Sequence, residues 1–453
     1  MAVQAERRSL EVIFMSLCHI RDTNDIELLL KDPNTLNSLQ KLRIASHFRH
    51  TDHLTDLLCG APNLEELSMV GSTNDEQHII YAGVAKLKQL RRLHIAYPGD
   101  MSELAPLAEN QTLQSLAFIF SGYHDKDKFS ECSNVVSKLQ SLESLTCSFE
   151  IMSPTYDWAF LSSLTELQTL ILSNTRNFDS PLPTSLRNLA LNGDVNLEAA
   201  PHLLAPLTNL KSLSITLKSF TGLPETMNKL TNLESLLLQP SSVSLRDVDI
   251  SKLTKLTKLT ILCEQGPNFF ESLQHCRDLN SLTLYQSNHI RLDIVGSLPL
   301  QRLIFIWAMN SFDQLMAVMD LAEQLKDLVH FQCTLMSSKS FTQPECYEYG
   351  AKIAKLGHVS ELVLPSIGLG NQHLAPYFFS IICKHLPHFK VLKGVITERD
   401  SGLTMVEYLK EFESLVSLET VQSHRIWNNV RRHKTLLHYT AVWSPCGGIV
   451  PFE

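Results

Sequence analysis

The chain has 453 residues, of which 44% are hydrophobic and 19% are charged, and its formal net charge is −8. This composition supplies ample apolar side chains for a folded core and lies far from the low hydrophobicity and high charge of disordered chains. The mild negative charge also argues against a nucleic-acid partner, which would require a concentrated basic surface.

The N-terminal segment, residues 1–35, is predicted to form a helical cap. Its apolar stretch from Leu10 to Leu17 is too short and too interrupted for a secretory signal. The longest later apolar stretch, Leu303 to Met309, is far shorter than the roughly 20 residues that a membrane-spanning helix needs. We therefore expect no membrane association.

From residue 36 to residue 423 a short phrase recurs: an apolar residue, two variable residues, an apolar residue, one variable residue and usually a third apolar residue. Clear copies are Leu39-x-x-Leu42-x-Ile44, Leu210-x-x-Leu213-x-Ile215 and Val359-x-x-Leu362-x-Leu364. We count about sixteen copies, and their middle apolar residues, here called central anchors, follow at intervals of 19 to 31 residues. The last copy is placed at Leu418-x-x-Val421-x-Ser423.

This phrase resembles the core of the leucine-rich repeat. The resemblance implies an α/β solenoid, or horseshoe, with a parallel β-sheet on the concave face and helices or irregular returns on the convex face. Because no repeat can bury its anchors without neighbours, the phrase predicts one solenoid domain over residues 36–423. Residues 424–453 are then expected to form a C-terminal cap or tail.

The segments that return between strands differ along the chain. Residues 53–58 and 101–107 have helical spacing, whereas the intervals between central anchors 189 and 282 leave room for only short turns or irregular returns. Later intervals are longer, and apolar residues three and four apart favour helices there. The helices predicted in this later part span residues 312–325, 347–356, 374–386 and 403–415.

The turn after each strand departs from the family pattern. The family places an Asn there, whose side chain satisfies backbone groups, but the corresponding positions of this chain carry none, as at His47, Pro98 and Lys218. Ser, Thr and Asp in other copies can take only part of that role. We therefore expect an irregular solenoid of variable curvature.

The ten cysteines are scattered, without a C-x-x-C pair or a cluster at either end. The cysteine-dense caps that extracellular leucine-rich repeats often carry are thus missing. Cys147 and Cys333 fall on the third apolar position of the phrase, where a reduced thiol behaves as a small buried hydrophobe. This usage favours a cytoplasmic, reducing environment.

Alternation along each strand predicts which residues face outward. The residues just before and just after each central anchor should form the exposed side of the sheet, which is hydroxyl-rich in its middle. Charged and aromatic residues gather toward both ends, and such side chains often dominate binding. The predicted partner-binding residues are Arg43, Glu66, Arg92, His94 and Tyr97 in a first cluster, and Tyr285, Arg302, Trp307, His330 and Gln332 in a second.

Motifs for chemistry are missing from the sequence, which has no phosphate-binding loop, nucleophile elbow or zinc-protease motif. Two small groups contain metal-binding residue types, His47-x-x-His50-x-x-His53 and Cys383 with His385 and His388. Both fall in return segments, where solvated polar residues are ordinary, and a metal needs converging ligands. We expect no catalytic site, no cofactor and no metal.

The resemblance implies a non-enzymatic scaffold that binds a protein partner on its concave face. An alternative is an F-box-like substrate-recognition subunit of a ubiquitin ligase, because residues 10–17 and Asp22 have a faint likeness to an F-box core. Against it, the Leu-Pro opening is missing and only about 35 residues precede the first copy. The pattern leaves the oligomeric state open.

Overall fold

The computed structural model describes residues 33–45, 51–70, 83–96, 101–120, 130, 133–149, 157–176, 178–195, 203–217, 225–240, 249–263, 265–285, 290–309, 311–335, 342–364, 391–394, 417–420 and 438–441. The chain divides into two compact units. Unit 1 comprises Met1–Phe220 and Pro224–Leu233, and unit 2 comprises Thr221–Leu223 and Glu234–Glu453.

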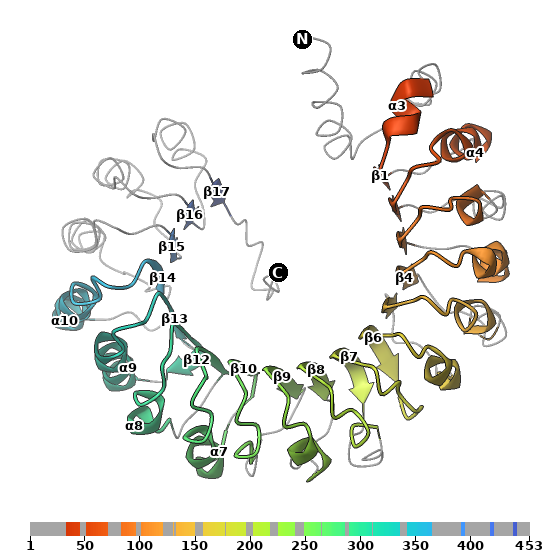
Figure 1. The fold of residues 1–453 in the computed structure, drawn as a ribbon. Coiled ribbons are helices and arrows are strands. Elements are labelled where there is room, and N and C mark those ends of the chain that lie inside the picture. Colours follow the sequence, from red (N-terminus) through yellow and green to blue (C-terminus); the bar gives the residue numbers. More distant parts are fainter. Residues whose placement is uncertain are drawn as a thin grey trace. The chain divides into compact units, whose positions relative to one another are not determined.

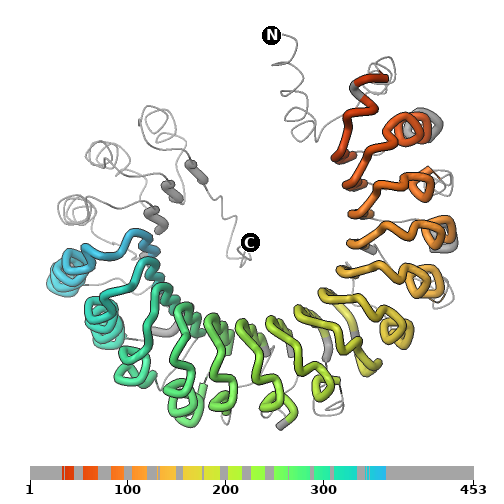
Figure 2. The backbone as a smooth tube through the Cα atoms, viewed as in Figure 1, coloured from red at the N-terminus to blue at the C-terminus, as the bar shows by residue number. Residues whose placement is uncertain are grey.

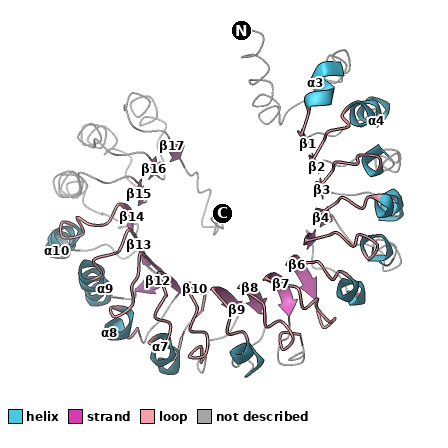
Figure 3. Ribbon diagram, in the orientation of Figure 1, coloured by secondary structure: helices cyan, strands magenta, loops and turns pink. Residues whose placement is uncertain are grey.

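Unit 1 is built on a ladder of parallel strands that pair in chain order (Figure 1). Within this unit the strands lie along the inner side and the helices along the outer side (Figure 3). Its strands are β1 (Lys41–Ala45), β2 (Glu66–Val70), β3 (Arg92–Ala96), β4 (Ser115–Phe120), β5 (Ser144–Phe149), β6 (Thr169–Arg176), β7 (Asn188–Val195) and β8 (Ser212–Leu217). Its helices are α3 (Pro33–Ser38), α4 (Thr51–Gly60) and the 3-10 helices η1 (Met101–Glu109), η2 (Ala159–Ser163) and η3 (Glu225–Lys229).

Unit 2 repeats this plan, with parallel strands in chain order and α-helices in its returns (Figure 2). Its strands are β9 (Ser235–Pro240), β10 (Lys258–Ile261), β11 (Ser281–Tyr285), β12 (Arg302–Met309), β13 (His330–Leu335), β14 (Glu361–Leu364), β15 (Val391–Gly394), β16 (Ser417–Thr420) and β17 (His438–Ala441). Its helices are α7 (Pro267–Leu273), α8 (Leu292–Val295), α9 (Phe312–Gln324) and α10 (Gln343–Ile353).

The repeated phrase forms these strands because its apolar residues share one face. From β1 to β14 every central anchor is at most 3% exposed, and paired strands align anchor with anchor, as Leu42 with Leu67 and Leu259 with Leu282. Burying a Leu side chain contributes about 1.5–3 kcal/mol, so each repeat depends on its neighbours for stability. The predicted leucine-rich-repeat solenoid with a parallel sheet is confirmed within both units.

The strands begin at a recurring backbone contact between repeats. The carbonyl oxygen of Gln40 accepts hydrogen bonds from the backbone N–H groups of Glu65 and Glu66, at 2.8 and 3.0 Å. In unit 2 the carbonyl of Val329 accepts from Ser360 and Glu361, both at 3.0 Å. A carbonyl has two lone pairs and can serve both donors. This contact holds consecutive repeats in register without any particular side chain.

Polar side chains just before the first apolar residue of the phrase join neighbouring repeats in the turn that precedes each strand, which is not the turn where the family places its Asn. Each donates to a backbone carbonyl of the preceding repeat, and such bonds satisfy groups that the turn would otherwise leave unpaired. The bonds are Asn63 to Asn37 (2.7 Å), Thr112 to Leu90 (2.9 Å), Ser141 to Gln111 (2.8 Å), Ser185 to Leu167 (2.7 Å) and Asn232 to Thr208 (3.0 Å).

The predicted returns are partly confirmed. Residues 53–58 lie in α4, residues 101–107 lie in the 3-10 helix η1, and the helix predicted at 312–325 is α9, capped by the Ser311 hydroxyl. The helix predicted at 347–356 is wrong in its start, because α10 begins at Gln343 after a capping box of Thr342 and Glu345. The helices predicted at 374–386 and 403–415 lie outside the described residues.

A short, irregular return was expected between anchors 259 and 282, and this prediction is wrong at α7. Seven residues from Pro267 fit an α-helix of two turns, with proline at the first turn, where its missing N–H costs nothing. Phe269, Phe270 and Leu273 bury one face of this helix, and the two phenyl rings meet edge to face with centroids 5.2 Å apart.

The last predicted copy is wrong in register. Leu418, not Val421, pairs with Leu392, so the phrase is Leu415-x-x-Leu418-x-Thr420. The polar Thr420 hides this copy, whereas Val421 imitates a central anchor. The residues predicted as a cap or tail also contribute a strand, because β17 pairs with β16.

Candidate interaction face

The first predicted cluster lies on the outward side of β1, β2 and β3. Register aligns Lys41 with Glu66 and Arg92, and Arg43 with Ser68 and His94. Glu66 Oε1 accepts from Arg92 Nη1 at 2.6 Å and faces Lys41 Nζ at 3.2 Å. Four predicted residues are thus brought together, and these six outward residues are called the β1–β3 surface below. Tyr97 lies outside the described residues.

His94 is the titratable member of the β1–β3 surface. It is half-buried, its Nδ1 lies 3.4 Å from the Ser68 hydroxyl, and burial lowers its pKa below the usual 6.5. The positive charge of Arg43, two strands away, lowers the pKa of His94 further. The imidazole is therefore predominantly neutral at pH 7 and can donate or accept a hydrogen bond.

Beyond β3 the outward side of unit 1 is polar and uncharged. The two outward positions of β4 to β8 carry only Ser, Thr, Asn, Ala or Ile, and Asn188 donates to the Thr169 hydroxyl at 3.1 Å. This agrees with the hydroxyl-rich middle that the sequence predicts. At the two outward positions of each strand, unit 1 therefore carries charged residues only on β1, β2 and β3.

The second predicted cluster is looser. Arg302, His330 and Glu361 stand side by side on β12, β13 and β14, and His330 Nδ1 lies 2.7 Å from Glu361 Oε2. Gln332 lies on the same side of β13, two residues after His330, and is half-buried. Tyr285 ends β11 and is separated from His330 by β12. Trp307 lies within β12, but its side chain is outside the described part of the structure.

Two outward positions of unit 2 are buried, which the sequence does not predict. Thr283 and Ile304 pair across β11 and β12, and each is 8% exposed. Ile304 also lies beside Gln332 on β13. Branched or long side chains in neighbouring rows cover one another on a sheet, so this part of the face is closed rather than open.

Sequence reasoning missed Lys41 and Glu361 as members of the two clusters. Each completes an ion pair with a predicted residue, Lys41 with Glu66 and Glu361 with His330. Their outward position just before a central anchor is the signal that could have found them. Aligning the copies of the phrase in register is enough to place both beside their partners.

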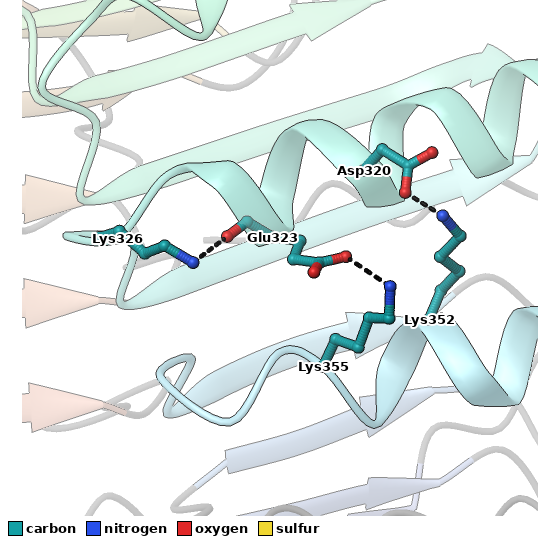
Figure 4. A network of polar contacts seen from close by, with 5 residues as sticks. All are labelled: Asp320, Glu323, Lys326, Lys352 and Lys355. Carbon is teal, nitrogen blue, oxygen red and sulfur yellow. Dashed lines mark hydrogen bonds and ion pairs between the residues drawn. The ribbon is translucent and has the colours of Figure 1, made fainter.

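The outer side of unit 2 also carries charge, in a network between α9 and α10 (Figure 4). Lys352 pairs with Asp320, Lys355 Nζ lies 3.2 Å from Glu323 Oε2, and Lys326 Nζ donates to the Glu323 carbonyl at 2.9 Å. These pairs join neighbouring repeats through their helices. Since each of the two carboxylates is paired with a lysine of the neighbouring repeat, the network has a structural explanation.

Among the residues that the structure describes, no group of three His, Cys, Asp or Glu side chains could hold a metal ion. The two groups singled out in the sequence, around His50 and around His385, lie outside the side chains described. Within the same described part, no helix is both long and apolar enough to cross a membrane.

Comparisons with known proteins were made at the levels of sequence and structure. No family model and no curated protein matches the sequence. Among solved structures, an internalin of Listeria monocytogenes is similar, with 16% identity, a TM-score of 0.43, and coverage of 81% of this chain and 92% of that chain. A leucine-rich-repeat protein of Leptospira interrogans gives the same identity and TM-score over 91% of this chain and 97% of that one. On the register of its own repeats, this chain has the leucine-rich-repeat fold.

Proposed function

We propose that this chain is a non-enzymatic scaffold that binds a protein partner through the strand side of its repeats. The proposal is supported by the two-sided design of each strand, in which anchors bury one side and variable residues fill the other. The proposed contacts are Arg43, Glu66, Arg92, His94 and Tyr97 in unit 1, and Tyr285, Arg302, Trp307, His330 and Gln332 in unit 2.

The observation that carries the proposal is the β1–β3 surface. Arg43 and Arg92 are exposed and stand on rigid strands, so a partner can contact them with little loss of backbone entropy. Arginine side chains are enriched among residues that dominate binding energy. The thiols of Cys147 and Cys333 are buried as small apolar side chains, which further supports a reducing environment for the protein.

Affinity capture from a cell lysate, read by quantitative mass spectrometry, tests this function with paired variants. Arg43→Glu with Arg92→Glu changes unit 1, and Arg302→Ala with Gln332→Ala changes unit 2. Lys326→Ala with Gln324→Ala alters the exposed end of α9 on the outer side and is the matched control. We expect one set of proteins to be recovered by the wild type and the control and lost with a strand-side variant.

Equal recovery by all four proteins would remove the strand side as the binding face. Circular dichroism of each variant verifies that the fold is retained. The alternative of an F-box-like ubiquitin-ligase subunit depends on residues 10–22, which lie outside the described residues. The same capture tests it, because a ligase adaptor would be recovered by the wild type and lost on deletion of residues 1–32.

A further inference from the structure

The β1–β3 surface has an excess of positive charge. Its outward cations are Lys41, Arg43 and Arg92, and its one acid is Glu66, which is placed between Lys41 and Arg92. At the strand starts, Glu65 and Arg91 add one charge of each sign. The surface therefore carries about two uncompensated positive charges, in a chain whose formal net charge is −8.

Arg43 is the cation with the least compensation. It is exposed on β1, and no carboxylate of the described residues lies within ion-pair distance of its guanidinium. Ser68 and His94 align with Arg43 on the next two strands, so the positive charge of Arg43 acts on a half-buried imidazole and not on a carboxylate. Like charges held together cost free energy, and an arriving anion would relieve that cost.

The positive charge of unit 1's outward side is localised at the β1–β3 surface. The two outward positions of β4 to β8 are uncharged, so nothing at those positions screens or extends the β1–β3 surface. Charges on a surface act over about 10 Å at moderate salt, which is close to the width of three strands about 4.8 Å apart. The field is thus that of a compact patch, suited to a short charged segment.

Resting on the proposed function, we infer that the β1–β3 surface binds an extended acidic segment of the protein partner. One carboxylate lies on Arg43, and a second lies at β3, beside His94 and Arg92. These positions are about two strand spacings, or roughly 9–10 Å, apart. In an extended peptide with polyproline II geometry, residues three apart lie on the same face and are separated by about 9 Å, so Glu or Asp at that spacing matches the surface.

The same arrangement makes binding depend on pH. The groups that face His94 are Arg43 from β1, Glu66 and Ser68 from β2, Arg92 on its own strand, and the uncharged Ser115 and Ala117 from β4. A carboxylate on Arg43 neutralises the charge that disfavours the imidazolium, and a second carboxylate stabilises it directly. Binding should therefore take up a proton and tighten as the pH falls from 7.5 to 5.5.

Fluorescence anisotropy with a synthetic probe tests this inference on the full chain. The probe is a fluorescein-labelled twelve-residue peptide with Glu at every third position and Ser elsewhere, and its matched control replaces every Glu by Gln. We expect the Glu peptide alone to bind, with weaker binding between 50 and 300 mM NaCl. Arg43→Gln should weaken binding about fivefold, because one close charge pair contributes about 1 kcal/mol.

Three further variants sharpen the measurement. Arg43→Glu reverses the charge and should weaken binding about tenfold or more, whereas Glu66→Gln removes the resident acid and should tighten it several-fold. Lys258→Gln removes an exposed cation from β10, outside the β1–β3 surface, and should leave affinity unchanged. Thermal melting verifies that all variants are folded, which their exposed or half-buried positions favour.

Equal affinity of the Glu peptide for wild type, Arg43→Gln and Lys258→Gln would overturn the inference, since it would show unlocalised charge attraction. A single-stranded oligonucleotide that binds more tightly, with the same dependence on Arg43, would overturn the assignment to an acidic peptide. Failure of the Glu peptide to bind, while the unit 1 variant still loses its captured partner, would refute the acidic chemistry and leave the proposed function standing.

Discussion

The outward sides of β1–β3 and of β12–β14 are built on the same phrase but differ in kind. In unit 1 an acid is shared by two cations, and Arg43 and Arg92 are exposed. In unit 2 Arg302 is exposed, His330 pairs with Glu361 with its side chain only 13% exposed, and Ile304 is buried beside them. The first surface presents its charges to solvent, whereas in the second the His330 side chain and Ile304 are largely covered.

This difference shows that the buried anchors do not determine the character of the outward surface. Burial of the inward residues is nearly identical in the two regions, as Leu93 and Leu303 illustrate. The character of the outer surface then depends on the size and charge of its outward residues alone. A strand solenoid can therefore carry two unlike surfaces without any change in its backbone plan.

The largest expected effect is in thiol reactivity, where an exposed thiol of unit 1 is compared with two buried thiols of unit 2. Cys59 of α4 is exposed, whereas burial raises the pKa of Cys333 to about 12 and that of Cys276 to about 11. Because the thiolate is the reactive form, only about 10⁻⁴ of a thiol with the Cys333 pKa is reactive at pH 8. We expect Cys59 to be alkylated in the native protein and Cys333 only after unfolding, as mapped by mass spectrometry. Native labelling of Cys333 at the rate of Cys59 would contradict this.

Matched core substitutions test whether the two units are equally stabilised. Phe118 of β4 and Phe305 of β12 occupy the same third position of the phrase and are 1% and 0% exposed. Replacing either by Ala should cost about 3–5 kcal/mol of unfolding free energy, measured by urea denaturation with local hydrogen exchange as a second readout. A cost below about 1 kcal/mol for one of them would show that the cores, and not only the surfaces, differ.

The irregular strand pair β6–β7 of unit 1 should be sensitive to an added methyl group. Register shifts between Ser173 and Thr175 of β6, beside Gly193 of β7, and between Phe305 and Met309 of β12. A Cβ at Gly193 would lie 2.3 Å from the Thr175 carbonyl oxygen, so Gly193→Ala should cost about 2 kcal/mol or more. Gly83→Ala is the control, because its Cβ would meet only ordinary contacts at 3.7 Å or beyond. Equal melting temperatures for the two variants would refute the close approach.

The smallest expected effect concerns His94 alone. Arg43→Gln removes one of the two causes that lower its pKa, so NMR titration of the imidazole should show the pKa rising toward 6.5, with burial keeping it below that value. The lowered pKa means that the folded state binds fewer protons than the unfolded state. Stability contributed at neutral pH is therefore lost as the pH falls through 6.5 toward the folded-state pKa. An unchanged His94 pKa in Arg43→Gln would break the link between the two residues.

The fold could be predicted from sequence to the extent that anchors are apolar and evenly spaced. Leu42 and its equivalents locate the strands and their register, because burial dictates both. Prediction fails at Val421, where an apolar residue imitates an anchor and Thr420 ends the true copy, and at α7, where two adjacent Phe residues stabilise a helix in a short interval.

The candidate site could be predicted in position but not in environment. Register placed Arg43, Glu66 and His94 together, since neighbouring copies align residue by residue. The burial of Ile304 was not predictable, because it depends on how the side chains of neighbouring strands pack against one another. The side-chain bond from Asn63 to the preceding repeat was missed because the family's own Asn occupies a different turn.

A backbone carbonyl accepts two N–H groups at the start of β2 to β8 and of β10 to β14, and this contact bears on how such proteins can be redesigned. Its two donors are backbone groups, as at Glu65 with Glu66 and Val329 with His330. Charged, polar and apolar residues can therefore all supply these donors. Proline is the one amino acid that would break the junction, because it has no N–H to donate. Charges on the strand side can therefore be exchanged between repeats, so that the β1–β3 surface could be transplanted onto other strands while the spacing of the array is preserved.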